Sequence, residues 1–239
     1  MEINILLFIA TAIIELVLVL VAWRLGKSYL QSFIIMNIIL TGLFVGVLVP
    51  IFGFITTAGE VFYAAIFIAT DILSEHYGKR EGLKTVFNGF FILAAFTVLS
   101  QIGISYLPFE DSQVISSSLS SVFELIPRIT LSSFVAYLIA QTADIHIFHL
   151  IKQITGPNHL WLRNNVSTIT AQLLDCLVFF PLAFFGAVSA EVLISLIITS
   201  WMFKVPVALL DTVCIYLSYW IKKPKPDLNP NQILLESNI

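Results

Sequence analysis

Residues 165–187 read NVSTITAQLLDCLVFFPLAFFGA, a run that is long and apolar enough to cross a lipid bilayer as one helix. Asp175 lies near the centre of this run. A charged side chain at the bilayer centre costs about 2.5–3.5 kcal/mol even on the most lenient insertion scale. Further charged residues inside apolar runs are Glu15, Asp71, Glu75, Asp144, Lys204 and Asp211. Helices that only contact lipid would not carry so many charges. We therefore expect an all-α polytopic membrane protein with an internal polar pocket or route, most simply a transporter.

The composition independently favours a membrane protein. Hydrophobic residues make up 58% of the chain, charged residues 11%, and the mean hydropathy is +0.95. A soluble domain carries roughly 25% charged residues, so this chain could not cover a water-facing surface. The net charge of −3 offers no basic face for nucleic acid. Cys176 and Cys214 lie in apolar runs and are expected to be small core residues rather than a disulfide.

Apolar runs predict seven membrane spans, which form a single helical domain over residues 1–223. The spans are residues 3–23, 30–54, 58–77, 85–106, 124–151, 165–187 and 190–221. The first run lacks a basic leader and is too long for a signal peptide. We expect kinks or local unwinding at Pro127, Pro181 and Pro206. The polar tail, residues 224–239, is expected to be disordered.

The basic residues predict the orientation of the chain. Ten of the twelve lie on one side of the membrane, after the first, third, fifth and seventh spans. They are Arg24, Lys27, Lys79, Arg80, Lys84, Lys152, Arg163, Lys222, Lys223 and Lys225. The opposite side carries mostly acidic residues: Glu60, Glu110, Asp111, Glu124 and Glu191, with Arg128. By the positive-inside rule the N-terminus is outside and the C-terminus is cytoplasmic. Residues 107–123 form the longest external segment, which we interpret as a linker rather than a gate.

A nine-residue pattern, A-Q-x-x-D-x-x-[IV]-F, occurs twice, at residues 140–148 and 171–179. The fifth and sixth spans run in opposite directions, so the repeat is inverted in the membrane. Inverted repeats commonly form a binding site near the midplane at their interface. Gln141 and Asp144 share a helix face, as do Gln172 and Asp175. The alternative is a chance match in low-diversity apolar sequence, in which the polar pairs only hold helices together.

Lys204 lies near the middle of the last span. A buried ammonium group must lose its proton or find a carboxylate, and Asp175, at similar depth, is the expected partner. Such a pair suits a structural role and a substrate contact equally. Asp71 lies one turn deeper in its span than Glu75, which is expected to be solvated. Glu15 has no close polar companion, and we expect it to face another helix or a partner.

Asp144, His146 and His149 form a D-x-H-x-x-H pattern that would suit a metal-dependent enzyme. Only the two histidines share a helix face, and the sequence has no second group of cysteine or histidine residues to complete a site. Walker, G-x-S-x-G and H-E-x-x-H motifs are also absent from the sequence. We therefore expect no metal, no other cofactor and no enzymatic activity.

Four stretches carry a family resemblance. They are TDILSEHYGK at residues 70–79, Pro127-Arg128-Ile129 followed by AYLIAQ at 136–141 and Asp144, WLRNNVST at 161–168 leading into Gln172 and Asp175, and Lys204 in the last span. Together they resemble the queuosine precursor transporter family, also called the vitamin uptake transporter family. They cover most of residues 30–222 in the family's order. The first span, with Glu15, lies outside the six-helix core of that family.

The resemblance implies import of 7-cyano-7-deazaguanine or 7-aminomethyl-7-deazaguanine across a bacterial inner membrane. A guanine-like edge presents N1–H and an exocyclic amine as donors and O6 as an acceptor. Carboxylates such as Asp144 or Asp175 suit the donors, whereas Lys204, Gln141 or Gln172 suit O6. Phe and Trp side chains can stack on the ring. The substrate-binding residues expected on this basis are Asp71, Gln141, Asp144, Gln172, Asp175 and Lys204.

Two other interpretations stay open from the sequence. The chain would also suit a substrate-capturing membrane subunit that works with a separate ATPase, and co-purification of an ATPase would identify that role. An intramembrane metal-dependent enzyme is the third interpretation, which metal analysis of the purified protein would test. The driving ion, the oligomeric state and the preferred precursor do not follow from the sequence.

Overall fold

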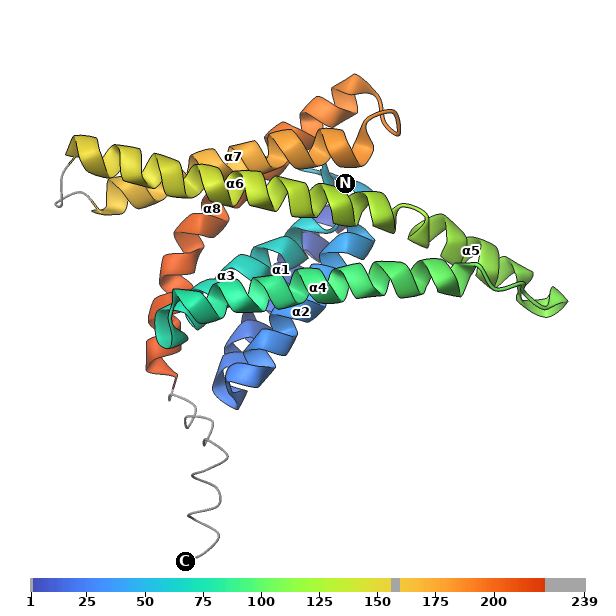
Figure 1. The fold of residues 1–239 in the computed structure, drawn as a ribbon, viewed down its shortest axis with the longest axis horizontal. Helices are drawn as coiled ribbons and strands as arrows, with labels where there is room; N and C mark the ends of the chain where they lie inside the picture. Colours follow the sequence, from blue (N-terminus) through green and yellow to red (C-terminus); the bar gives the residue numbers. More distant parts are fainter. Residues whose placement is uncertain (1, 156–159, 222–239) are drawn as a thin grey trace, which may run out of the picture.

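The computed structural model describes residues 2–155 and 160–221, apart from the side chains of residues 79, 145, 148, 149, 152, 160–165, 207–213 and 215 (Figure 1). The long helices are α1 (Glu2–Leu25), α2 (Lys27–Phe44), α3 (Glu60–Tyr77), α4 (Lys79–Ile104), α6 (Ile126–Thr155), α7 (Leu160–Phe184) and α8 (Ala190–Trp220). A two-stranded hairpin, β1 (Leu48–Ile51) and β2 (Phe54–Thr57), separates α2 from α3. The tail predicted to be disordered, residues 224–239, lies outside the described residues.

The protein is an all-α polytopic membrane protein, as its sequence predicted. Five segments of the described chain are long and apolar enough to cross a bilayer. They are Glu2–Leu25, Lys27–Phe44, Arg80–Ile104, Glu110–Asp144 and Val166–Phe184. The helices α3 and α8 are not among these five, and α3 carries three carboxylates within eighteen residues. The count of seven spans, which adds α3 and α8 to these five, stays a prediction.

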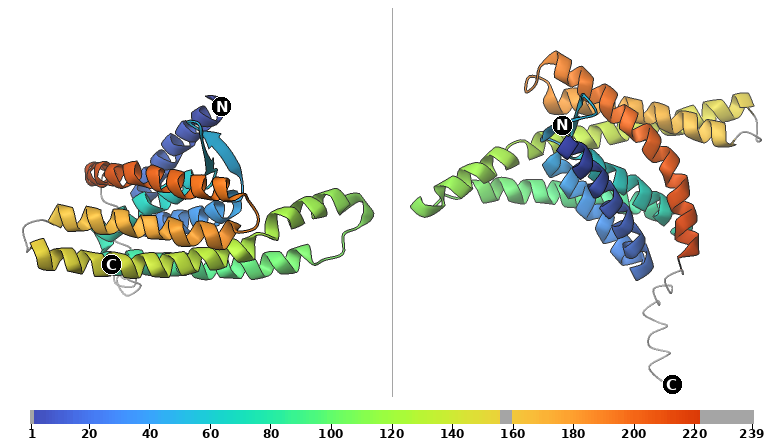
Figure 2. Two further views of the ribbon diagram at one scale, coloured as in Figure 1. Left: turned by 90° about the horizontal axis from the view of Figure 1, so that it is seen from above. Right: turned by 180° about the vertical axis from the view of Figure 1, so that it is seen from behind.

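The helix α3 is central to the assembly because α1, α2, α4 and α8 all pack against it. Its neighbours are protein rather than lipid, which explains how it accommodates acidic residues. The helices α6 and α7 pack along each other as an antiparallel pair (Figures 1 and 2). A short connection after α7 leads into α8, which packs against α7 in turn. The helix α8 curves across α3 and carries Pro206 within it (Figure 2).

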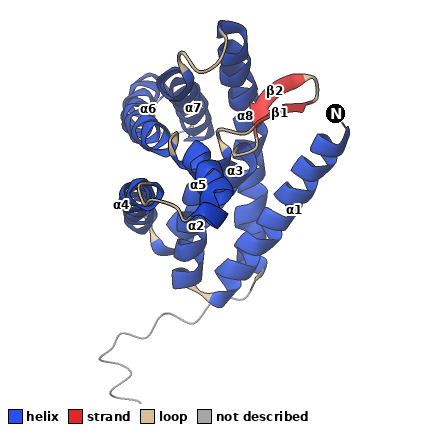
Figure 3. Cartoon of the chain, turned by 90° about the vertical axis from the view of Figure 1, so that its right-hand side faces the viewer, coloured by secondary structure: helices blue, strands red, loops and turns tan. Residues whose placement is uncertain are grey.

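The predicted second span, residues 30–54, is wrong at its C-terminal end. The helix stops at Phe44, and residues 48–57 form the antiparallel hairpin, with Leu48 opposite Thr57. Pro50 cannot donate a backbone hydrogen bond, and the Val, Ile and Thr residues here favour strands over helix. Both turn residues, Phe52 and Gly53, have positive φ. The hairpin lies against the N-terminal end of α1 and beside α8 (Figure 3).

The segment 107–123, which the sequence predicts to be external, is largely helical. It contains a short 3₁₀ turn, η1 (Glu110–Ser112), and the helix α5 (Gln113–Phe123), which projects away from the other helices (Figure 1). Val114, Ile115 and Leu119 on α5 are exposed. This segment connects α4 to α6, and its interpretation as a linker rather than a gate stays a prediction.

Two apolar cores hold the helices together. The first is formed by α1, α2 and α3 around Val19, Trp23, Ile34 and Ile72. The second joins α7, α8, the start of α6 and the end of α2; its fully or nearly fully buried members are Val45, Ile129, Cys176, Phe180, Ala183, Phe184 and Leu196. Cys176 and Cys214 are both buried and are not bridged by a disulfide, as predicted. A cavity with a mostly apolar wall and several polar side chains lies between the elements of these two cores.

The expectation that Glu15 has no polar companion is wrong. Glu15 is buried at the α1–α2 interface close to the side chain of Asn37, which is itself fully buried. Asn37 also donates from Nδ2 to the carbonyl of Phe33 at 3.2 Å. The sequence concealed this pair because the two residues belong to different helices. Glu15 therefore faces a helix of its own chain, which is one of the two roles expected for it.

Candidate functional site

A cavity of about 540 Å³ lies among α2, α3, α4, α6, α7 and α8. Its size is within the range typical of small-molecule sites. The cavity extends from Thr57 and Gly59, beside the hairpin, to Gly82 and Leu83 at the start of α4. All six residues that were expected to bind substrate line it, so the fold brings them to one site: Asp71, Gln141, Asp144, Gln172, Asp175 and Lys204.

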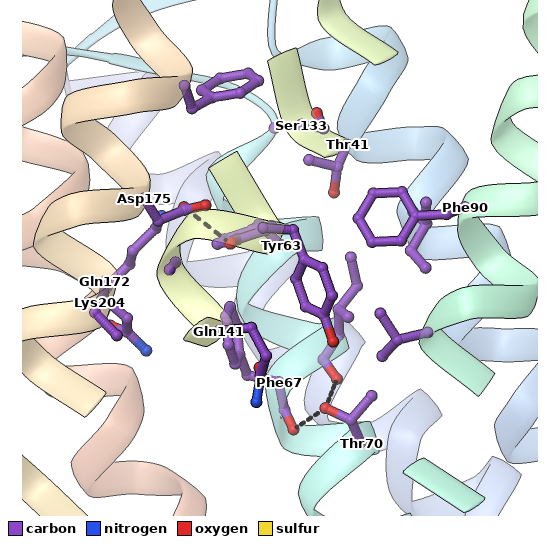
Figure 4. Close-up of a pocket in the computed structure, with 18 of the residues that line it drawn as sticks. Thr41, Tyr63, Phe67, Thr70, Phe90, Ser133, Gln141, Gln172, Asp175 and Lys204 are labelled. Carbon is purple, nitrogen blue, oxygen red and sulfur yellow. Dashed lines mark hydrogen bonds and ion pairs between the residues drawn. The ribbon is translucent and has the colours of Figure 1, made fainter. Parts of the chain in front are cut away.

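The strongest electrostatic contact in the cavity joins α7 to α8. Lys204 Nζ lies 2.7 Å from Asp175 Oδ2, and the two side chains are only 8% and 14% exposed. The predicted pairing of these residues is confirmed. The hydroxyl of Tyr63 on α3 donates to the same carboxylate oxygen at 3.1 Å (Figure 4). The ammonium group also lies 4.3 Å from the centroid of the Tyr63 ring, a cation–π contact. Three helices are therefore connected through one charge pair.

The two copies of the sequence repeat meet at this cavity. Gln141 and Asp144 come from α6, and Gln172 and Asp175 come from the antiparallel α7. Gln172 is 8% exposed, and its Oε1 is buried without a hydrogen-bond partner among the described residues. Asp144 Oδ1 is in the same situation. A buried acceptor without a donor costs about 1–3 kcal/mol, so these atoms are suited to accept hydrogen bonds from a ligand.

Asp71 lies on α3 and lines the cavity. The adjacent Thr70 donates its hydroxyl to the carbonyls of Ile66 and Phe67 and also faces the cavity (Figure 4). Glu75, one turn further along α3, is exposed as expected and accepts a hydrogen bond from Tyr219. Asp71 and Glu75 therefore differ in environment, although their spacing puts them on one helix face.

The sequence analysis missed Glu60 and Tyr63 as site residues. It placed Glu60 among the external acidic residues, whereas the side chain is buried, lines the cavity and accepts a hydrogen bond from the buried hydroxyl of Ser200. The sequence pattern that could have identified them is a spacing of three or four residues, which puts four side chains on one face of α3: Glu60, Tyr63, Phe67 and Thr70.

Aromatic side chains form much of the remaining wall. They are Tyr63, Phe67, Phe90, Tyr137, Phe179 and Phe180. The rings of Phe90 and Tyr137 lie 5.1 Å apart, and those of Tyr63 and Phe67 lie 4.9 Å apart edge to face. These faces can stack on a planar heterocycle. The expected tryptophan contribution is not found among the described lining residues, and Trp201 instead donates to the carbonyl of Ile169.

A smaller cavity of about 130 Å³ adjoins the first and extends to α1. Glu60, Tyr63, Phe67, Gln172 and Lys204 line both cavities and therefore form the partition between them. On the other side of the partition, Phe8 of α1 packs against Phe203 of α8, with ring centroids 5.2 Å apart. The N-terminal helix thus contributes to the surroundings of the site.

Among the described side chains no group of three metal-ligating residues occurs. His146 is exposed and donates from Nδ1 to the carbonyl of Thr142 at 2.7 Å. The side chains of His149 and Asp211 lie outside the described residues. The observed site is therefore a largely apolar, partly aromatic cavity with a few convergent polar and charged groups inside a helical membrane protein, the arrangement of a small-molecule transporter.

Comparison with known proteins identifies the family. The family model described as "Putative vitamin uptake transporter" matches residues 57–218. The chain is 34% identical over 202 residues to the "Probable queuosine precursor transporter" of Bacillus subtilis (strain 168), an alignment that covers 84% of this chain and 88% of the relative. It is 28% identical over 171 residues to the "Queuosine precursor transporter" of Escherichia coli (strain K12), covering 70% and 74%. No solved structure matches.

The chain belongs to this vitamin uptake transporter family, whose curated relatives are named as queuosine precursor transporters. It is a membrane transporter for a small molecule, and the relatives' names assign no enzymatic activity. The family model begins at residue 57, so it does not include α1 and α2.

Proposed function

We propose that this protein imports a 7-deazaguanine precursor of queuosine, 7-cyano-7-deazaguanine or 7-aminomethyl-7-deazaguanine, across the bacterial inner membrane. The observation that carries the proposal is the pair of unsatisfied acceptors, Gln172 Oε1 and Asp144 Oδ1, in a cavity with aromatic walls. The guanine-like edge of such a base offers N1–H and an amino group, which are the donors that these acceptors lack.

The substrate-binding residues of this proposal come from four helices. Gln141 and Asp144 on α6, Gln172 and Asp175 on α7 and Lys204 on α8 contribute polar groups, and Asp71 on α3 completes the set. The ring stacks on Phe and Tyr faces of the cavity. The Lys204–Asp175 ion pair connects α8 to α7 beside the cavity. The Lys204 ammonium group can also donate a hydrogen bond to O6 of the base.

The proposed orientation puts the N-terminus outside and the C-terminus in the cytoplasm, with all seven long helices crossing the membrane and residues 1–223 forming one domain. It is supported by the basic residues that flank the turns α1–α2 and α3–α4, whereas the connection α4–α6 carries acidic ones. The tail 224–239 then belongs to the cytoplasmic side.

The test is the queuosine content of tRNA in bacterial cells that cannot make the precursors. Cells with this protein, fed each base in turn, should regain queuosine, and cells without it should not. Asp175→Asn and Gln172→Leu should abolish the recovery while the protein still accumulates in the membrane. Asp111→Asn, which changes an exposed carboxylate outside the cavity, is the matched control and should preserve it. Equal queuosine content with and without the protein would refute the proposal.

A further inference from the structure

The end of the cavity beside the hairpin is where α2 stops and α3 begins. The two helix ends are in close contact there, because a Cβ at Gly59 would lie 3.0 Å from the backbone nitrogen of Val45 and 3.1 Å from the carbonyl oxygen of Thr41. Thr41, on the last turn of α2, therefore lies close to Thr57 and Glu60, which are on either side of Gly59 in the chain. Thr41, Thr57 and Glu60 all line the cavity, and Thr41 points into it (Figure 4).

Two hydroxyl groups at this end of the cavity lack a partner. Thr57 is fully buried, and its Oγ1 has no hydrogen-bond partner among the described residues. The Oγ1 atom of Thr41 is also buried without a partner in that part of the chain. A buried hydroxyl group that makes no hydrogen bond is costly, and it commonly indicates a bound water, ion or ligand. Because both residues line the cavity, a ligand in the cavity can reach them.

Glu60 adds a negative charge beside the two hydroxyl groups. It is 8% exposed, its Oε1 accepts a hydrogen bond from Ser200, and its carboxylate interacts electrostatically with Lys204. A carboxylate has about four acceptor sites, so these contacts do not use its full capacity. The C-terminal end of α2 contributes the negative end of its helix dipole. This end of the cavity therefore combines oxygen ligands with a negative potential.

The combination suits Na⁺ better than a divalent cation or a proton. Divalent cations are usually bound by several carboxylates, and no group of three His, Cys, Asp or Glu side chains occurs in the described part of the chain. A proton would occupy Glu60 alone and leave both threonine hydroxyl groups without a partner. In transporters, the ends of interrupted helices commonly coordinate Na⁺ beside the substrate. The chain between α2 and α3 is interrupted in this way by the hairpin.

We propose that Glu60, Thr57 and Thr41 bind Na⁺ at the hairpin end of the cavity and that this ion strengthens substrate binding. Water in the cavity completes its coordination. Lys204 connects the two sites, since it interacts with Glu60 and forms the ion pair with Asp175. A cation at Glu60 weakens the attraction of that carboxylate for Lys204 and thereby favours the Lys204–Asp175 pair. The sequence-based expectation of no metal considered only histidine and cysteine sites. The ion site is independent of the substrate's identity, whereas its coupling to the base rests on the proposed function.

The first measurement uses Na⁺ without any base. The purified full-length protein in lipid nanodiscs is unfolded thermally in NaCl, KCl and choline chloride at equal ionic strength. Na⁺ should raise the unfolding temperature in a saturable way, because it binds the folded state, whereas the other two salts should not. Equal unfolding temperatures in the three salts would overturn the inference. A stabilisation that follows pH and not Na⁺ would also overturn it, in favour of a proton at Glu60.

Variants then identify the ligands of the ion. Thr57→Val and Thr41→Val keep the size of the side chain and remove one hydroxyl group each. Each should weaken Na⁺ binding about 10-fold or more, the loss expected for one polar contact. Their unfolding temperatures in choline chloride should not fall, because these hydroxyl groups have no partner among the described residues. Glu60→Gln should abolish the effect of Na⁺, and if that variant does not fold, the two threonine variants decide the question.

Thr56→Val is the matched control. Thr56 is next to Thr57, is fully buried and also has an unpartnered hydroxyl group within the described structure, but it does not line the cavity. Its replacement should leave Na⁺ affinity unchanged. Unchanged Na⁺ affinity in both Thr57→Val and Thr41→Val, or an equal loss in the control, would contradict the proposed site.

Binding of the 7-cyano base with and without Na⁺ tests the coupling. Saturating Na⁺ should tighten binding of the base by about 5- to 150-fold, the usual range for coupled sites, and the base should tighten Na⁺ binding by the same factor. If the protein binds no base but is still stabilised by Na⁺, the proposed function is wrong and the ion site stands. If the base binds equally well in NaCl and choline chloride, the proposed function stands and the coupling is wrong.

Discussion

Breaking the Lys204–Asp175 pair from one side should destabilise the protein far more than neutralising both residues. The two atoms lie 2.7 Å apart, which corresponds to a Coulomb energy of about 6 kcal/mol at an effective dielectric constant of ~20. Lys204→Met leaves the Asp175 carboxylate with Tyr63 as its described partner, and Asp175→Asn leaves a buried ammonium group. Each single change should cost about 3–5 kcal/mol, the usual range for an uncompensated buried charge.

The double variant Lys204→Met/Asp175→Asn removes both charges and should recover about 3 kcal/mol relative to the sum of the two single losses. Thermal unfolding in detergent of the wild-type protein, both single variants and the double variant measures this coupling. The Lys27–Glu81 pair is the matched control, because its atoms are also 2.7 Å apart but its side chains are 26% and 27% exposed. Its coupling should be much smaller than that of the buried pair, because solvent screens exposed charges.

The outcome that refutes this reasoning is strict additivity at Lys204 and Asp175. Additive losses would mean that the two charges do not stabilise each other, and the ion pair would then not explain how α7 and α8 are held together. Coupling of the same size in the exposed control pair would also contradict the argument, because burial would then have no effect on the energy.

Three further predictions follow from other contacts. Cysteine introduced at Asp111 should react with an impermeant reagent added outside intact cells, whereas cysteine at the exposed Ser28, in the first turn of α2, should not. The reverse pattern would reject the proposed orientation. Arg128 donates from Nε to the carbonyl of Leu182 at 2.8 Å and from Nη2 to that of Phe185 at 2.7 Å, so Arg128→Gln should lower stability by about 1–3 kcal/mol, measured by thermal unfolding, and an unchanged transition would show that this link between α6 and the end of α7 is dispensable. A Cβ at Gly59 would lie 3.0 Å from the backbone nitrogen of Val45 and 3.1 Å from the carbonyl oxygen of Thr41, so Gly59→Ala should cost about 1–3 kcal/mol by the same assay, whereas Gly103→Ala, which meets no atom within 4 Å, should be neutral or slightly stabilising.

The amino-acid sequence by itself determined the class of fold and much of the site. Runs of apolar residues the length of a bilayer can bury their backbone polar groups only as helices, which made the all-α membrane fold predictable. Charges inside those runs, such as Asp175 and Lys204, are costly in lipid and therefore marked the polar interior. Their similar depth, counted along the chain, was sufficient to predict the pair.

The tertiary structure decided what depends on contacts between helices. Residues 45–54 continue the apolar run of α2, so the sequence predicted that the second span extends through them. The tertiary structure instead shows that Pro50 and the β-branched residues around it form a hairpin. Glu60 is the first residue of α3, and its place at the end of an apolar run predicted an exposed side chain. Its contact with Ser200 on α8 instead buries it in the cavity wall. Glu15 and Asn37 lie on different helices, so no local pattern reveals their contact. Sequence periodicity reports the face of one helix, whereas the partner of that face is decided by how the helices pack.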